Sequence, residues 1–179
     1  MKKYEILAEE KDLFRVVPLK ILRQTPGVVF DLVPVGAFSS IDGIDRVLHE
    51  GGALSPGSVG DVERPWYMHP HQEDNLVVLA GSRDIDLCSL QTRRSVHFTV
   101  HPDRVYRDGR LFCDRPAMVC WPTKVFHRIA SSREKGSASI NIAVRHEGFD
   151  IRTNFNVYDL DERTGEYRVV REGHLDQPS

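Results

Sequence analysis

Short runs in which apolar and polar residues alternate dominate the chain. In Ser95–His101 the apolar residues Val96, Phe98 and Val100 share one face, which is the period of a half-buried β-strand. Arg83–Leu90 alternates in the same way. Further short runs with strand character are Val28–Val33, Asn75–Leu79, Ala117–Trp121, Val125–Ala130, Ser137–Val144, Phe155–Tyr158 and Tyr167–Val170. The pattern predicts an all-β protein of about ten strands with one or two short helices, arranged as a sandwich or barrel.

Turn residues between these runs predict where the chain reverses direction. Asp108 and Gly109 separate Val105–Arg107 from Arg110–Phe112. This dipeptide favours a two-residue hairpin, because both central turn positions require positive φ. A loop around Gly165 similarly predicts a hairpin near the C-terminus.

Three segments have a less regular pattern. Val28–Val33 is a continuous apolar run with one aspartate, and we interpret it as a buried strand. Ser39–Leu48 can hold a short helical turn with Ser40 or Asp42 as its N-cap. His174–Ser179 is interpreted as a frayed tail.

Length and composition indicate one ordinary globular domain spanning residues 1–179. Of the 179 residues, 40% are hydrophobic and 28% are charged, and the net charge of −2 comes without a basic block. Nucleic acid is therefore not an expected partner. No apolar run has the length of a membrane helix or a signal core, so we expect no membrane partner and a cytoplasmic location. Three cysteines, Cys88, Cys113 and Cys120, form no CxxC pair, and we expect reduced thiols.

A pair of histidines, His69 and His71, is the strongest chemical signal in the chain. Alternate residues of a strand point to the same face, so the two imidazoles can converge on one point. A third imidazole, His127, lies in another strand-like run, and either Asp74 or Glu73 can add a carboxylate. Such a set of nitrogen and oxygen ligands suits Fe(II), Mn(II), Ni(II), Zn(II) or Cu(II). The plain alternative is that these histidines are solvated or held by hydrogen bonds.

Aromatic residues stand close to these histidines. Tyr67 is two positions before His69 and would share its face, where its hydroxyl could act as an acid or hold a substrate oxygen. Trp66 and Trp121 each lie near a candidate ligand and could shape a pocket or serve as core. Arg128 has the opposite parity to the neighbouring His127 and is expected outside the barrel, and His97 and His101 are assigned to a solvent-facing strand surface.

The first histidine motif resembles that of the cupin superfamily, which comprises small jelly-roll barrels also called double-stranded β-helices. In those proteins a His-x-His pair is followed by an acidic residue and by a glycine that closes the next strand. Here His69 and His71 are followed by Glu73 and Asp74 and then by Gly81, and the count back from Gly81 favours Asp74 as the acidic position.

The second cupin motif places a histidine shortly after a proline. Here Pro122 precedes His127 by five residues, with Lys124 where the family usually has glycine. The two motifs and the strands between them span about residues 60–145, a stretch that the resemblance identifies as the cupin core. The N-terminal strands and the C-terminal hairpin would then complete the barrel or a homodimer contact.

The resemblance implies a metal-dependent cupin that acts on a small oxygenated molecule as a dioxygenase or an isomerase. A second hypothesis is a metal-independent enzyme similar to the cupins that epimerise nucleotide-linked keto sugars, which use a histidine base and a tyrosine acid. A third is a barrel that binds a small ligand without catalysis. Turnover that depends on O2, proton exchange without metal, and binding with neither would distinguish these three hypotheses.

Overall fold

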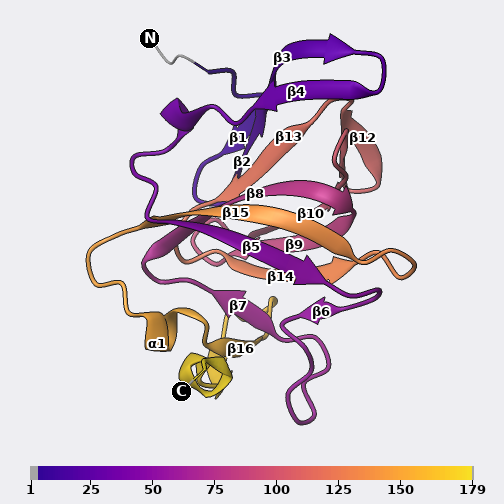
Figure 1. Cartoon of the computed structure of the whole chain (residues 1–179). Coiled ribbons are helices and arrows are strands. Elements are labelled where there is room, and N and C mark those ends of the chain that lie inside the picture. The colour runs from indigo at the N-terminus through magenta and orange to yellow at the C-terminus, as the bar shows by residue number, and fades with distance from the viewer. Residues whose placement is uncertain (1–3, 179) are drawn as a thin grey trace.

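Two antiparallel β-sheets, each built from strands far apart in the sequence, form the body of the molecule (Figure 1). The computed structural model describes residues 4–178. In spatial order, the six strands of the first sheet are β1 (Ala8–Glu10), β2 (Phe14–Pro18), β13 (Ala117–Trp121), β8 (Gln72–Gly81), β15 (Ser137–Arg145) and β5 (Gly43–His49). This order mixes early and late strands, which is typical of a jelly roll.

The second sheet follows the same interleaved principle. In spatial order its strands are β12 (Arg110–Cys113), β11 (Val105–Arg107), β10 (Arg94–Val100), β9 (Arg83–Ser89), β14 (Phe126–Ser131), β7 (Trp66–Met68), β16 (Val157–Leu160) and β17 (Tyr167–Arg171), with β6 (Leu54–Ser55) also paired to β14. The fold is therefore the single-domain, all-β jelly roll that the cupin resemblance implies, and it agrees with the sandwich or barrel that the alternation predicts.

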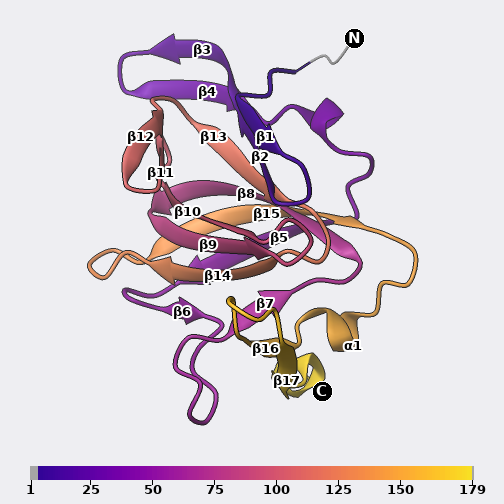
Figure 2. The ribbon, with the colours of Figure 1, turned by 180° about the vertical axis from the view of Figure 1, so that it is seen from behind.

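Little of the chain lies outside the two sheets. A separate hairpin of β3 (Lys20–Thr25) and β4 (Val28–Leu32) stands at one end of the molecule, opposite the C-terminal elements (Figures 1 and 2). Within residues 4–178 the helical elements are α1 (Ile151–Asn154) and two 3₁₀ turns, η1 (Val35–Ala37) and η2 (Gly173–Asp176). None of these helices is long and apolar enough to cross a membrane.

The hydrophobic core lies between the two sheets. Phe14 of β2 and Leu76 of β8 belong to the same buried cluster as Leu87 of β9 and Phe98 of β10. The rings of Phe14 and Phe98 meet edge to face, with 5.0 Å between their centroids. Each such side chain contributes about 1.5–3 kcal/mol when it is fully buried, so this packed half holds the sheets together.

The other half of the barrel is hollow. Here β5 and β15 pair in a register that sets Asp45 opposite Asn141 and His49 opposite Ser137. Polar and small residues at these positions fill less space than the leucines and phenylalanines of the packed half. A cavity of about 230 Å³ remains, lined by residues of β5, β8, β9, β14 and β15.

Several local predictions are confirmed. Asp108 and Gly109 both have positive φ, 49° and 76°, in the turn between β11 and β12. The apolar face of β10 points into the core, as its alternation predicts. The three cysteines are buried and free.

The prediction of a buried strand at Val28–Val33 is wrong about burial. Residues 28–32 do form β4, but among the strands of residues 4–178 it pairs only with β3, and all five of its residues are exposed. Phe30, for example, is 56% exposed. An apolar run predicts a strand from local propensity, whereas burial depends on which elements cover it.

The expected homodimer stays a prediction.

The helical turn expected within Ser39–Leu48 is also wrong. Residues 43–49 form β5, which pairs with β15 along its whole length. Ser40 and Asp42 do not cap a helix; Ser40 donates a hydrogen bond to Asp42, which accepts another from the amide of Arg145. The ladder with β15 outweighs the weak local preference for a turn.

The frayed tail expected at His174–Ser179 is ordered through residue 178. Residues 173–176 form η2, and Arg171 makes an ion pair with Asp176 at 2.6 Å. Gln177 donates a hydrogen bond to the carbonyl of Ile151. These contacts hold the tail against α1, while Ser179 lies outside the described residues.

We expect Gly136→Ala to destabilise the fold more than Gly109→Ala. Both glycines have positive φ, which costs an alanine about 1–2 kcal/mol. A methyl group at Gly136 would also overlap the backbone carbonyl of His49, adding about 1–3 kcal/mol, whereas Gly109 has open space around it. Urea unfolding of both variants tests this difference, and equal losses would contradict it.

Candidate metal centre

Three buried side chains from separate strands meet in the hollow half of the barrel. His69 directly follows β7, Asp74 lies in β8 and His127 lies in β14. Their potential ligand atoms all lie within 4.8 Å of one another, and each residue is at most 4% exposed. The structure therefore brings together two of the three predicted histidines and one of the two predicted carboxylates.

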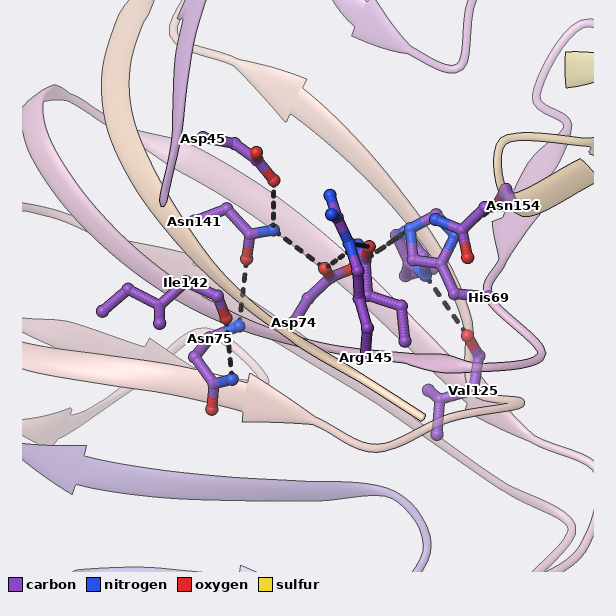
Figure 3. Close-up of polar contacts among 11 residues, drawn as sticks. Asp45, His69, Asp74, Asn75, Val125, Asn141, Ile142, Arg145 and Asn154 are labelled. Carbon is purple, nitrogen blue, oxygen red and sulfur yellow. Dashed lines mark hydrogen bonds and ion pairs between the residues drawn. The ribbon is translucent and has the colours of Figure 1, made fainter. Parts of the chain in front are cut away.

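Backbone carbonyls orient both imidazoles. Nδ1 of His69 bonds the carbonyl of Asn154, and Nδ1 of His127 bonds the carbonyl of Val125 at 3.2 Å (Figure 3). Because a carbonyl can only accept, both Nδ1 atoms carry a hydrogen. Both Nε2 atoms therefore face the centre of the cluster, where Asp74 Oδ2 lies 3.1 Å from His69 and 3.8 Å from His127.

The Asp74 carboxylate is held from its other side by two amides. Its Oδ1 accepts hydrogen bonds of 2.8 Å from Gln72 Nε2 and from Asn141 Nδ2. The backbone amide of Asn75 in turn donates a hydrogen bond to Oδ1 of Asn141 (Figure 3). These bonds satisfy Oδ1 and leave Oδ2 facing the two imidazoles.

The three groups shift one another's protonation. Burial alone would raise the pKa of Asp74, but the adjacent His69 and the hydrogen bonds lower it below its ordinary value. Burial alone would lower the pKa of His69, and the Asp74 carboxylate raises it overall. Burial and repulsion from His69 lower the pKa of His127 to about 4. At neutral pH the site therefore contains a carboxylate and one neutral imidazole, His127.

His71 does not belong to the cluster, contrary to the three-histidine prediction. The prediction assumed a continuous strand, but β7 ends at Met68 and β8 begins at Gln72, so residues 69–71 form a bend. Pro70 has no amide hydrogen with which to continue a ladder. The His71 ring lies against Gly148 instead, and its carbonyl accepts a hydrogen bond from the amide of His146.

The choice between the two predicted carboxylates follows from strand parity. Asp74 shares the inward face of β8 with Gln72 and Leu76, which also line the cavity. Glu73 points away from the cluster and pairs with His146 at 2.9 Å. Glu73 is therefore not a member of the candidate centre.

Aromatic side chains form part of the wall around the cluster. Tyr67 pairs with His127 across β7 and β14, with 6.0 Å between ring centroids, and burial raises its pKa. Trp121 stacks obliquely on His127 at 5.1 Å, and Phe155 approaches His69 at 5.3 Å. These rings restrict the access of water to the cluster.

Trp66 has no place at the site, although the sequence puts it close to His69. It packs in a separate cluster with Phe126 and Tyr158, and the Arg128 guanidinium lies 4.0 Å from its ring centroid. The outward position predicted for Arg128 is confirmed. His97 also lies on this outer surface, where it bonds Asp86 at 2.7 Å.

Sequence reasoning missed the residues that support the cluster. Gln72 and Asn141 orient the carboxylate, and Asn154 supplies a carbonyl to His69. A weak signal was present in the alternation of β15, where Ser137, Ser139 and Asn141 all take inward positions. No local pattern in the sequence predicts that His69 bonds a carbonyl 85 residues away, that of Asn154.

A second polar network lies at the opposite end of the cavity. Arg83 Nε donates to Ser137 Oγ at 3.0 Å, and Ser137 Oγ lies 2.8 Å from Ser131 Oγ. Ser131 Oγ in turn bonds His49 Nδ1 at 2.8 Å. Burial and the charge of Arg83 lower the pKa of His49 to about 4, so this imidazole is neutral at pH 7.

Comparisons with known proteins support the fold. No family model matches this chain, and no curated protein matches its sequence. Among solved structures, a dTDP sugar isomerase from Desulfovibrio desulfuricans G20 is similar with a TM-score of 0.56 over 80% of this chain and 83% of that chain, at 12% identity. This likeness establishes the fold alone, and it is consistent with the cupin-type jelly roll that the motifs imply.

Acid should destabilise the wild type partly through His49. Its pKa lies near 4 in the folded state and near 6.5 in the unfolded state, so between these values the unfolded chain binds more protons. This contribution to stability is complete above pH 6.5 and declines as the pH falls towards 4. We expect His49→Gln to flatten the dependence of unfolding free energy on pH in this window.

Thermal and urea unfolding from pH 4 to 7 would measure this effect. His101→Gln is a matched control, because His101 packs on Tyr106 away from the network. A His49→Gln profile as steep as that of the control would contradict the assignment.

Proposed function

We propose that His69, Asp74 and His127 bind one divalent transition metal, and that the protein is a cupin-type enzyme acting on a small oxygenated molecule. The observation that carries this proposal is the orientation of the two imidazoles. Backbone carbonyls occupy both Nδ1 atoms, and both Nε2 atoms face the same carboxylate oxygen. Metal-ligating histidines typically donate their other N–H to such a partner.

The donor set fits a metal in kind and in number. Two imidazoles and one carboxylate suit Fe(II) and related ions and leave positions open for other ligands. Metal binding at such residues displaces protons, so the proton shared by His69 and Asp74 would leave. A bound ion would supply Lewis-acid polarisation of a substrate oxygen or, in the case of iron, oxygen chemistry.

The surrounding residues would orient the substrate and exclude water. The raised pKa of Tyr67 keeps its hydroxyl protonated at neutral pH, so it can donate a hydrogen bond to a substrate oxygen. Trp121 and Phe155 supply apolar walls beside the histidines. The cavity of about 230 Å³ is smaller than typical pockets for drug-sized ligands, which favours a small substrate.

A metal-independent epimerase is the second candidate, favoured by the fold likeness to a dTDP sugar isomerase and by the pairing of His69 with Asp74. A histidine base needs a free ring nitrogen that can accept a proton from the substrate. Both ring nitrogens of His69 are engaged, by Asn154 and Asp74. His127 would have to serve as the base, and its low pKa makes it a weak one.

We expect the wild type to bind about one divalent ion per chain, and His127→Ala to weaken this binding by at least about 100-fold. Loss of a partner outside the ligand set already costs about 10–100-fold, and a ligand should matter more. Calorimetric titration with Fe(II), Mn(II), Ni(II) and Zn(II), together with elemental analysis after dialysis, measures stoichiometry and affinity.

His71→Ala is the matched control, because this histidine is close in sequence but lies outside the cluster. It should bind metal like the wild type. Loss of metal from His71→Ala but not from His127→Ala would overturn the assignment of ligands. Absence of binding in the wild type, together with deuterium exchange into a keto sugar by chelator-treated protein, would favour the epimerase.

A further inference from the structure

Arg83 is a buried cation without an acidic partner. Its side chain occupies an inward position of β9 and lines the cavity, and the residue is 1% exposed. Nε donates to Ser137 Oγ and Nη2 to the carbonyl of Val47, both neutral acceptors. Within residues 4–178, no carboxylate oxygen lies within 4.0 Å of its guanidinium. Proteins rarely bury a charge without a counter-ion.

The groups around Arg83 form a chain of hydrogen bonds that leads to His49. Ser137 accepts from Arg83, so its hydroxyl hydrogen is free to be donated to Ser131, and Ser131 can then donate to Nδ1 of His49. The reverse direction leaves the Ser137 hydrogen without an acceptor among the described residues. His49 therefore carries its hydrogen on Nε2, and it also lines the cavity. This end of the cavity therefore suits a ligand group that accepts hydrogen bonds.

The position of Arg83 relates this end to the candidate metal centre. Arg83 pairs with Ser131, which lies four residues beyond His127 along β14. Four residues of a strand span about 13 Å between backbone positions, so the backbone position of Arg83 lies at a different end of the cavity from the cluster. The wall between them is apolar, formed by Val47, Leu76 and Ile129.

The charges along the cavity select both the type of ligand and its direction. Asp74 and Asp45 lie on the lining together with the histidine cluster, whereas Arg83 lies on the same lining without a carboxylate beside it. An anionic group would be repelled by the aspartates and attracted by the guanidinium. One unpaired cation beside a neutral imidazole matches one negative charge, which favours a carboxylate over a phosphate dianion.

We propose that Arg83 binds the carboxylate of a small monocarboxylic substrate whose other, oxygen-bearing end reaches the His69–Asp74–His127 cluster. The proposed carboxylate site depends only on Arg83. The placement of the oxygen-bearing end of the substrate at the cluster rests on the proposed metal function. The substrate class is thus a short hydroxy or keto acid with an apolar middle.

The test compares butyrate with butyramide, which has the same shape without the charge. Because a carboxylate can also bind a metal directly, calorimetry is performed on chelator-treated, full-length protein. We expect the wild type to bind butyrate at least about tenfold more tightly than butyramide, since charge-assisted hydrogen bonds are the stronger kind. Arg83→Met should abolish this preference.

Arg128→Met is the matched control, because it removes an arginine from the outer surface of the neighbouring strand. This variant should keep the preference for butyrate. Equal affinity of the wild type for the acid and the amide would overturn the proposal, and so would a preference retained in Arg83→Met. The wild-type comparison stands even if Arg83→Met fails to fold.

Two further measurements separate this inference from the proposed function. His127→Ala should lose metal and keep the preference for butyrate. A wild-type protein that binds the acid but no metal would refute only the metal function. A protein that binds metal without any preference for the acid would refute only the role of Arg83. Tighter binding of inorganic phosphate than of butyrate would replace the carboxylate by a phosphate group and overturn the assignment.

Discussion

The buried Asp74 carboxylate is the interaction on which the rest of the site depends. An ionised carboxylate removed from water is costly unless each of its oxygens has partners. Gln72 and Asn141 satisfy one oxygen, and the imidazoles of His69 and His127 face the other. These partners come from β8, β15, β14 and the end of β7, so one charge ties together strands of both sheets. Residues that orient Asp74 are therefore as important to the centre as the three candidate ligands.

The division of the barrel into a packed half and a hollow half makes this arrangement possible. Phenylalanines and leucines between the sheets provide the apolar burial that stabilises the fold. That stability allows the other half to retain polar side chains and an open cavity. The jelly roll alone does not specify chemistry, because one fold supports many activities.

The cavity also has an electrostatic direction. Asp74 and the histidines lie at one end, and Arg83 with His49 lies at the other, separated by an apolar wall. Charges that line a partly buried cavity interact more strongly than they would in water. A ligand with one charged end would therefore bind in a single orientation. The likeness to a sugar isomerase carries no information on this point, because at 12% identity it reports on the backbone.

The sequence by itself determined the elements whose signals are local. Alternation within single strands predicts the sheets, Asp108 and Gly109 predict a hairpin, and the histidines mark the strands that meet at the site. Parity along β8 also favours Asp74, once its inward face is known. These signals are reliable because side-chain direction has a period of two residues within a regular strand.

Only the tertiary structure decided the matters that depend on contacts between distant segments. The bend at residues 69–71 turns His71 away, because strand parity does not extend across a break between two strands. Val28–Leu32 is exposed because, among residues 4–178, only one strand pairs with it and no other element covers it, and Gly43–His49 forms a strand because β15 pairs with it. The roles of Asn141, Asn154 and Arg83 arise from neighbours tens of residues away in the chain. Local propensity contains no information on those neighbours, since they become adjacent only when the sheets assemble.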